Sequence, residues 1–482
     1  MTRRLCALLV PWLFGLGCAV GPDFHRPPVP DDAVGFVRDP AKETVVADGK
    51  AQRVVEGPLA TADWWQMLHC PALDSIVRHA IAANPGLESA RATLRRSQDN
   101  LRAGAGVFFP QIDAKAGLSR QRYNPVPGTL PSSVFNLFTL SGTVSYSLDL
   151  WGGARREFEA LEAGVEAQRF ALAGAYVMLA GNVVNAVIAQ ASYRAEIEAT
   201  DAAVSLLREQ VRIGHAQVTA GTIPYVNVLS LESQLASTEA TVPPLEQKID
   251  QTADLLAALT GTTPATFRRT LVLLSDLDLP RDLPVSLPSE MVRQRPDILI
   301  AEAQLHAANA GIGVATAAML PNLTLSADYG ANSTTPSSLF SAGSVFWGLG
   351  AGLTQPLFHG GTLYYQRKAA IDARDVAAAD YRQTVLAAFE QVADVLQGLR
   401  HDADALVAQT AAVGSAERAM RLVEANYDAG VATYLQVLVA NGQYLQSKVG
   451  YVQAVAQRLQ DTAALCVALG GGWWNTPSAT RD

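Results

Sequence analysis

The feature that most constrains the fold of this 482-residue chain is an internal repeat. The stretch NPGLESARATLRRSQDNLRAGAGVFFPQIDAKAGLS at residues 84–119 is similar to RPDILIAEAQLHAANAGIGVATAAMLPNLTLSADYG at residues 295–330. Further on, AGTIPYVNVL from Ala220 is similar to AGVATYLQVL from Ala429. Similar segments in the same order predict two halves that contain the same structural elements.

Each half contains two segments in which apolar and polar residues alternate. In residues 138–150, FTLSGTVSYSLDL, apolar residues and one glycine hold the even positions, and polar residues hold the odd ones. A period of two places one kind of side chain on each face of a β-strand. We expect four strands, at about residues 109–122, 134–151, 320–333 and 343–358. The glycine-rich GLGAGLTQP from Gly348 falls in the last of them and opens no helix, so we interpret it as strand and not as a nucleotide-binding loop.

The first residues predict export to the bacterial envelope. Arg3 and Arg4 precede a mostly apolar run of 13 residues that is too short to span a bilayer as a helix, as in a signal peptide over residues 1–17. The following GLGC resembles a lipobox, although Leu16 stands one place later than that motif prefers. We expect Cys18 to carry a diacylglycerol and an N-acyl chain, and each buried CH₂ contributes about 0.8 kcal/mol to anchoring. Cleavage by an ordinary signal peptidase nearby, which would leave Cys18 as a plain thiol, is the alternative.

Strand length and export together indicate a membrane barrel. A transmembrane β-strand needs about 9–11 residues, and the expected strands are near that length. Aromatic residues gather at the strand ends, as in the aromatic girdles of outer-membrane barrels; they are Phe108, Phe109, Tyr123, Trp151, Phe340, Phe358, Tyr364 and Tyr365. The alternative is a pair of soluble hairpins that pack one face on helices.

Four strands are too few to close a barrel in lipid, where an open edge leaves backbone groups unsatisfied at a cost of several kcal/mol each. Several copies of the chain must therefore share one barrel. Two copies would supply eight strands, whose side chains fill the interior, and three would supply twelve and leave a lumen.

The rest of the chain is predicted to be helical. Residues 155–218 contain no proline, and a continuous helix over them would be about 95 Å long. Within them a seam at steps of four and three residues indicates a coiled coil; it comprises Leu161, Val165, Gln168, Leu172, Ala175, Leu179, Asn182 and Ala186. A further helical stretch is expected over residues 225–259, interrupted by Pro243 and Pro244, and long helices are expected over residues 361–427 and 433–469.

Composition excludes several function classes. The chain has 37 basic and 45 acidic residues, and this balance argues against nucleic-acid binding. The seven histidines are scattered, and no HExxH, CxxC, GxSxG or P-loop motif is present, so we expect no enzyme activity and no metal or other cofactor. Cys70 and Cys466 either form a disulfide in the periplasm or are separate small core residues.

Several motifs, in the same order, are similar to those of one family. They are CAVGPDFHRP at residues 18–27, DWW at 63–65, RPDI at 295–298 with AE at 301–302, LP at 320–321 and LGGGW at 469–473. The chain thus resembles the lipoprotein outer-membrane factors of RND efflux systems, the NodT-type, TolC-like channels. The resemblance implies a homotrimer with a twelve-stranded barrel in the outer membrane, four strands from each chain, continuous with an α-helical coiled-coil tunnel in the periplasm.

The resemblance also implies partners and site residues. The helix-hairpin tips, with Gly221, Thr222, Gly430 and Thr433, would contact a periplasmic adaptor protein, which links the duct to an inner-membrane RND-type transporter. Many members carry an aspartate in Tyr-Leu-Asp-Val-Leu, where this chain has Asn227 and Gln436; these two residues and Asp428 are candidates for a gate. The implied function is a passive exit duct for small molecules. A structural outer-membrane lipoprotein and a type I protein-secretion duct are the alternatives.

The expected layout follows from the repeat and the resemblance. It comprises a signal peptide (1–17), a lipidated segment with a periplasmic equatorial region (18–83), a first repeat with a hairpin tip near 214–224 (84–270), an inter-repeat linker (271–294), a second repeat with a tip near 428–434 (295–473) and a tail (474–482).

Overall fold

The computed structural model describes residues 19–28, 35–37, 43–57, 62–123 and 132–475. The chain divides into two compact units, which are described separately. The sheet unit comprises Met1–Pro27, Thr93–Arg169 and Ile300–Arg382. The helical unit comprises Pro28–Ala92, Phe170–Leu299 and Gln383–Asp482. The signal segment and Cys18 lie outside the described residues.

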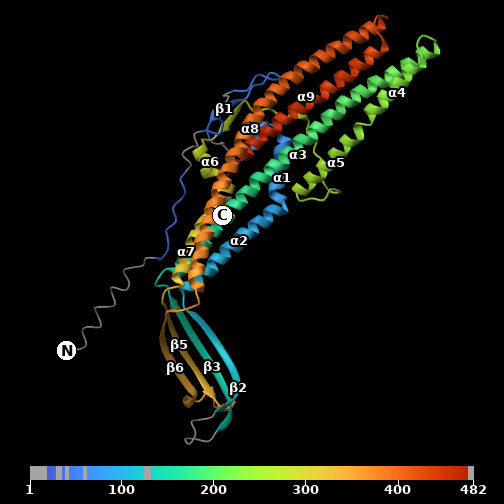
Figure 1. Ribbon diagram of the computed structural model, residues 1–482. Helices are drawn as coiled ribbons and strands as arrows, with labels where there is room; N and C mark the ends of the chain where they lie inside the picture. Colours follow the sequence, from blue (N-terminus) through green and yellow to red (C-terminus); the bar gives the residue numbers. More distant parts are fainter. Residues whose placement is uncertain (1–18, 29–34, 38–42, 58–61, 124–131, 476–482) are drawn as a thin grey trace. The chain divides into compact units, whose positions relative to one another are not determined.

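The sheet unit is built on a four-stranded antiparallel sheet (Figure 1). Its strands, in spatial order, are β2 (Gln111–Tyr123), β3 (Ser133–Leu148), β5 (Asn322–Ser333) and β6 (Val345–Thr354). The two hairpins come from different halves of the sequence, and β3 pairs with β5 to join them. The strands lie over the alternating segments, and their ends differ from the expected ones by at most four residues.

Four helices continue directly from these strands or lead into them. Helix α2 (Pro85–Gly104) precedes β2, and α3 (Gly153–Thr219) follows β3; in the second half, α7 (Pro296–Ala317) precedes β5 and α8 (Thr362–Asp428) follows β6. Helices α3 and α8 have 67 residues each and are therefore about 100 Å long. The most apolar part of α3 is 56% buried, so much of its hydrophobic surface is used in packing.

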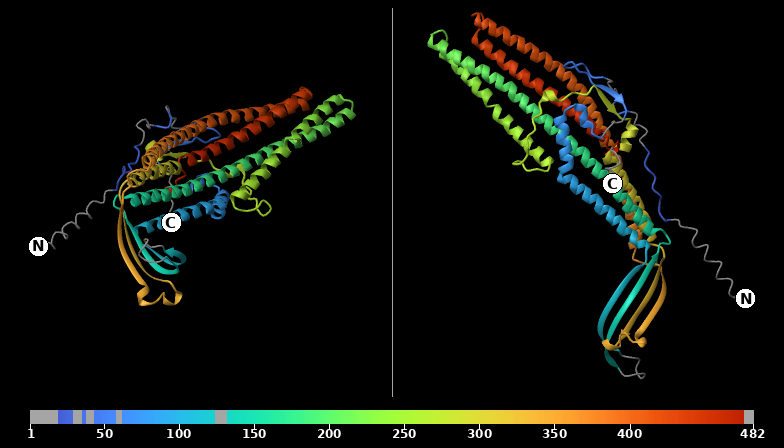
Figure 2. Two further views of the ribbon diagram at one scale, coloured as in Figure 1. Left: turned by 60° about the horizontal axis from the view of Figure 1, so that its bottom comes forward. Right: turned by 180° about the vertical axis from the view of Figure 1, so that it is seen from behind.

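In the helical unit each long helix is followed by an antiparallel helical segment, and the two form a helical hairpin (Figure 2). Helix α9 (Tyr434–Ala468) returns beside α8 without a break, whereas the return beside α3 is divided into α4 (Tyr225–Glu239) and α5 (Val242–Leu259). The break falls at Ala240 and Thr241, and Pro243 lies in the first turn of α5, where the missing N–H of proline has no helical partner to lose.

A second, two-stranded sheet lies in the helical unit, where no strand was predicted. Strand β1 (Arg53–Glu56) pairs in parallel with β4 (Asp282–Val285). Residues 53–56, before the first predicted repeat, are thereby joined to residues 282–285 of the predicted linker. The remaining helices are α1 (Pro71–Ala83) and α6 (Pro288–Gln294).

The core of the helical unit consists largely of small apolar residues. Val183, Val184 and Ile188 of α3 are fully buried, and a Cβ added to Gly181 would lie 2.7 Å from Val467 Cγ2. Small side chains therefore allow close helix packing. Cys70 and Cys466 are both buried and free, so they are separate core residues and form no disulfide. Burial raises the pKa of the Cys466 thiol to about 12.

Candidate functional site: a membrane sheet, an N-terminal clamp and two hairpin tips

The register of the four-stranded sheet collects the apolar side chains on one side. Val144 faces Ile112 on one neighbour and Ala327 on the other, and Ala327 faces Leu349. We call this side the apolar sheet face; it comprises Ile112, Ala114, Ala116, Leu118, Phe138, Leu140, Val144, Tyr146, Leu148, Leu323, Leu325, Ala327, Tyr329, Ala331, Val345, Trp347, Leu349, Ala351 and Leu353. Large side chains on this face are exposed to solvent: Leu349 is 79% exposed and Trp347 is 72% exposed. An exposed apolar surface of this extent marks contact with a membrane or a partner.

The extent of the apolar sheet face matches a lipid bilayer. Along β3 it runs from Phe138 to Leu148. Ten steps of about 3.4 Å give about 34 Å along the strand, or about 24 Å across a bilayer at a tilt of about 45°. Outer-membrane barrels carry an apolar band about 25 Å tall. This sheet is therefore long enough to cross the hydrocarbon layer once per strand.

The opposite side of the sheet is mostly polar. It carries Asp113, Lys115 and Asp328 among serines, threonines and glycines, with Phe135, Leu137 and Phe346 as apolar exceptions. The Thr143 hydroxyl donates to Asp328 Oδ1 over 2.8 Å across the β3–β5 pair. A sheet with one apolar and one polar face suits a barrel wall between lipid and a water-filled lumen.

Both outer edges of this sheet are open in the described chain. Strand β2 pairs only with β3, and β6 pairs only with β5. All 13 residues of β2 are exposed. Because lipid cannot satisfy backbone N–H and C=O groups, such edges need further strands in a membrane.

The first described residues are clamped onto the sheet unit. Val20 N–H donates to the carbonyl of Trp151 over 2.9 Å, and Asn309 Nδ2 donates to the carbonyl of Pro22 over 2.9 Å. Ala19 lies so close to Gly152 that a Cβ added there would be 2.5 Å from the Ala19 Cβ. We call residues 19–26 the N-terminal clamp.

Charged and aromatic contacts complete the N-terminal clamp. Arg156, which is 5% exposed, donates to Asp23 Oδ1 over 2.6 Å and to Glu159 Oε2 over 2.8 Å. Hydrogen bonding and the charge of Arg156 lower the pKa of the Asp23 carboxyl. Phe24 stacks on His306 with ring centroids 4.3 Å apart. The chain immediately after Cys18 is thus held close to the end of β3.

The two hairpin tips have the same local geometry. Gly221 and Gly430 have φ of +73° and +75°, the left-handed conformation that glycine adopts at low cost. After each glycine the next N–H reaches back into the preceding helix: Thr222 to the Gln217 carbonyl over 2.9 Å, and Val431 to the Asn426 carbonyl over 2.8 Å. This bond pattern satisfies carbonyl groups at a helix end. Thr222, Gly221 and Gly430 are exposed.

The candidate gate residues have different surroundings. Gln436 Oε1 accepts from the backbone N–H of Thr433 over 2.7 Å in a capping box, so it holds the start of α9. Asp428 is exposed at the end of α8, and Asn227 is half-buried on α4. Among the described residues, no hydrogen bond joins Gln436 to Asn227 or Asp428.

A contact between the two hairpins was not predicted. Tyr427 of α8 donates to Gln217 Oε1 of α3 over 3.0 Å, and its ring lies 5.9 Å from that of Tyr434. Burial raises the pKa of the Tyr434 hydroxyl, and burial with the charge of Asp428 raises the pKa of Glu424. The only sequence signal was the placement of two tyrosines beside the second tip.

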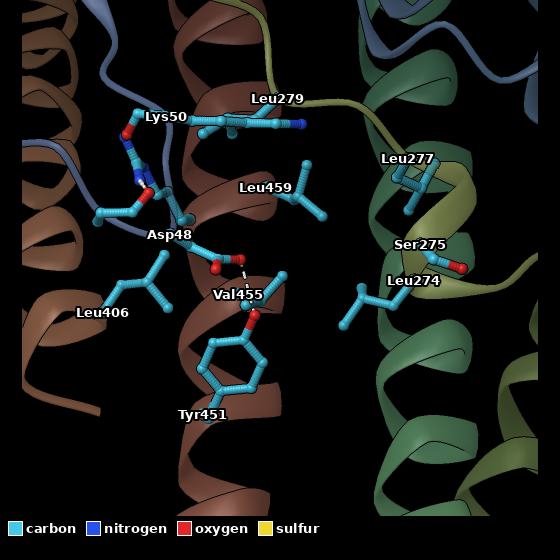
Figure 3. Close-up of a pocket in the computed structure, with 12 residues that line it drawn as sticks. Asp48, Lys50, Leu274, Ser275, Leu277, Leu279, Leu406, Tyr451, Val455 and Leu459 are labelled. Atoms are coloured by element: carbon cyan, nitrogen blue, oxygen red, sulfur yellow. Dashed lines mark hydrogen bonds between the residues drawn. The ribbon is translucent and has the colours of Figure 1, made fainter. Parts of the chain in front are cut away.

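A cavity of about 350 Å³ opens in the helical unit beside a buried arginine (Figure 3). Arg458 is 1% exposed, and Gln52 Oε1 and the Thr44 hydroxyl accept from it over 3.0 and 3.3 Å. Figure 3 shows Tyr451 bonded to Asp48, over 2.7 Å; burial and this contact raise the pKa of Tyr451 to about 12. These hydrogen bonds hold residues 44–52 against α9, so we assign Arg458 and Tyr451 a structural role. No group of three or more histidine, cysteine or acidic side chains suited to a metal occurs in the described part of the chain.

Comparison with known proteins agrees with this geometry. The family described as outer membrane efflux protein matches residues 76–262 and 287–471. The chain is 28% identical to the pyoverdine export outer membrane protein OpmQ of Pseudomonas aeruginosa, over 85% of this chain and 87% of that protein. It is also 28% identical to the probable efflux pump outer membrane protein TtgC of Pseudomonas putida, over 98% and 96%.

Solved structures show the same fold. The outer-membrane channel OprN superposes with a TM-score of 0.85 at 25% identity, over 95% of this chain and 100% of that chain. The outer membrane protein VceC of Vibrio cholerae has a TM-score of 0.79 at 26% identity, over 86% and 100%. Of these proteins, OprN is described as an outer-membrane channel. The family predicted from the sequence motifs is confirmed, and this chain belongs to the outer membrane efflux protein family.

Proposed function

We propose that three copies of this chain form one duct, with a twelve-stranded barrel in the outer membrane to which each copy contributes β2, β3, β5 and β6. The observation that carries the proposal is the sheet itself, which has one apolar face of bilayer height and two open edges. Pairing of β2 with β6 of a neighbouring copy would satisfy both edges. Twelve strands leave a lumen, whereas the eight strands of a dimer would fill their own interior.

The helices of the same three copies would continue the duct as a periplasmic tunnel. Supporting this, each half of the chain has a helix, two strands, a helix of 67 residues and a helical return in the same order. We therefore take residues 84–270 and 295–473 as two structural repeats joined by residues 271–294. Substrates would pass through the duct without chemical change, as small molecules delivered from the inner membrane.

The partners we propose are a periplasmic adaptor and an inner-membrane transporter of the RND type. TtgC is an efflux pump component by name, and OpmQ an export protein. The exposed tips, with Gly221, Thr222, Gly430 and Thr433, are the proposed adaptor contact. Asn227 and Asp428 remain candidate gate residues; Gln436 would act there while it also caps α9.

We propose that Cys18 carries the acyl anchor. The support is the N-terminal clamp, which begins at the next residue and ties Val20 to Trp151 close to the end of β3. An acyl chain attached there would enter the membrane beside the barrel wall, without a long free tether. Radiolabelled palmitate should be incorporated by the wild-type chain and not by Cys18→Ser; equal incorporation would contradict the assignment.

Conductance tests the duct directly. Reconstituted protein should give discrete current steps in a planar bilayer. Ser145→Trp places a large ring on the polar side of the sheet and should lower the single-channel conductance. Ala327→Trp is the matched control, because it places the same ring on the apolar sheet face. Absence of current from assembled protein, or an equal decrease in both variants, would contradict a lumen lined by the polar face.

A further inference from the structure

Two arginines lie at one end of the otherwise apolar side of the sheet. Arg120 and Arg122 of β2 are in alternation with Leu118, so their side chains share its side of the strand. Across the β2–β3 pair they face Asn136 and Val134. Both arginines are exposed. They are the only charged residues on this side among the described residues of the four strands.

The position of the pair relative to the apolar sheet face is set by the register. Leu118 faces Phe138, the last apolar pair of β2 and β3 at this end. Arg120 lies two residues beyond it, about 7 Å further along the strand, and Arg122 about 14 Å further. The other end of the apolar sheet face, at Leu148, is the end that leads into α3. If the helices are periplasmic, as the proposed function has it, the arginines lie at the outer surface of the membrane.

No carboxylate on this side of the sheet balances the two charges. The acidic residues of the four strands of this sheet are Asp113 and Asp328, and both belong to the opposite, polar side. The one side-chain bond of Arg122 in the described chain is to the Ser132 hydroxyl, over 3.3 Å, which is neutral. In the proposed barrel the next strand would be β6 of a neighbouring copy, and Val345–Thr354 contains no acidic residue. The counter-charge must therefore come from outside these strands.

Position and charge together point to one chemistry. At the level just above the hydrocarbon layer the available anions are lipid phosphates, and guanidinium groups bind phosphate through paired, charge-assisted hydrogen bonds. We propose that Arg120 and Arg122 form a binding site for the phosphate groups of the glycolipid of the outer leaflet, diphosphorylated lipid A.

The chain offers a matched control on the same strand. Lys115 also carries one positive charge on β2, but it faces the polar side of the sheet. The double variant Arg120→Gln, Arg122→Gln removes the proposed site, and Lys115→Gln removes a charge from the other face. Arg120→Lys with Arg122→Lys keeps the charge and loses the paired geometry, so it should retain part of the binding.

Native mass spectrometry of the full-length protein with added lipid provides the test. The wild-type protein and Lys115→Gln should bind diphosphorylated lipid A, and the double glutamine variant should bind at least about tenfold more weakly, since charge-assisted hydrogen bonds are lost. Dephosphorylated lipid A and phosphatidylglycerol should bind the wild-type protein weakly, and millimolar inorganic phosphate should not displace the glycolipid.

The proposal is overturned by unchanged affinity in the double variant, by an equal loss in Lys115→Gln, or by equal binding of dephosphorylated lipid A, of phosphatidylglycerol or of free phosphate in its place. The same spectra report the oligomeric mass. Assembled wild-type protein with no difference between the variants would refute the lipid site alone, whereas wild-type protein without an assembled barrel would refute the proposed function on which the site rests.

Discussion

At the scale of single residues, the second hairpin tip depends on Gly430. Its φ of +75° is the left-handed conformation, and a Cβ added there would meet no atom within 4 Å. Alanine should therefore destabilise the fold by about 1 kcal/mol through backbone strain alone. Gly442→Ala in the interior of α9 is the control, because that glycine has an ordinary helical φ and equally open space.

Thermal unfolding should show a lower midpoint for Gly430→Ala and an unchanged or higher midpoint for Gly442→Ala, since alanine is the better helix former. Equal shifts in the two variants would show that the tip does not require the left-handed conformation.

A half-buried carboxyl pair in the helical unit, Asp402 and Asp461, predicts a dependence of stability on pH. Burial, then the neighbouring Asp461 carboxyl, raise the pKa of Asp402 to about 7 against a usual value of 3.8, although the charge of Arg458 acts in the opposite direction. Asp402 Oδ2 is buried without a hydrogen-bond donor. The folded state holds the proton more tightly than the unfolded state, so this stabilising contribution is complete below about pH 4 and is lost as pH rises through about 7.

Asp402→Asn should therefore raise the free energy of unfolding at pH 8 and leave it nearly unchanged at pH 4. Denaturant unfolding at the two pH values checks the sign. The exposed Asp404→Asn provides the comparison and should change neither value. A loss of stability in Asp402→Asn at pH 8 would contradict the raised pKa.

Some residue roles were readable from the sequence and others were not. The role of the glycines at both tips was predicted, because a reversal between two helices needs a residue in the left-handed backbone conformation. The capping box of Thr433 and Gln436 has a readable spacing, yet Gln436 was interpreted only as a gate candidate. Arg156 was not found at all, since its partner Asp23 is 133 residues away in the chain and local patterns carry no information on that contact.

At the scale of elements, the strands were the best predicted part of the fold. Strict alternation located all four, because the side-chain period of a strand is two. Their register was not predictable, and it is the register that merges four alternating segments into one apolar face. Strands β1 and β4 were missed because they have four residues each, and a run of that length shows no alternation.

The predicted coiled-coil seam of α3 agrees only partly with the residues that are buried in that helix. Val165, Leu179 and Ala186 of the predicted seam are buried in α3, but Asn182 is exposed. The residues Val183, Val184, Val187 and Ile188 are buried as well. A single seam assumes one neighbouring helix, whereas a helix packed on several sides buries a wider part of its surface.

The apolar sheet face makes a prediction for membrane assembly. Leu349 lies mid-way along β6, opposite Ala327. Leu349→Arg should destabilise the membrane-inserted barrel by about 2–4 kcal/mol, the cost of an arginine in lipid. Ser326→Arg, on the polar side and one pair further along, should cost far less because its side chain would be in water.

The amount of folded protein in outer-membrane fractions, measured by heat-modifiable gel mobility, distinguishes the two variants. Normal assembly of Leu349→Arg, or a stronger defect in Ser326→Arg, would mean that the faces of the sheet are reversed.

At the scale of the whole molecule, the sequence predicted that one chain supplies too few strands to close a membrane barrel by itself. One chain has four strands that are long enough for a membrane, and four strands cannot close a barrel. The structure adds which strands carry the open edges, and these are β2 and β6. The open edges do not determine how many chains share a barrel, because that number depends on the curvature of the combined sheet.

The most direct test of the account is the mass of the detergent-extracted complex, measured by native mass spectrometry. In the same complex, a cysteine placed on β2 is cross-linked to a cysteine placed on β6. The account predicts a mass of three chains, and cross-links that join different copies into a closed ring of three. A complex of one or two chains, or a β2–β6 cross-link that forms within a single chain, would contradict it.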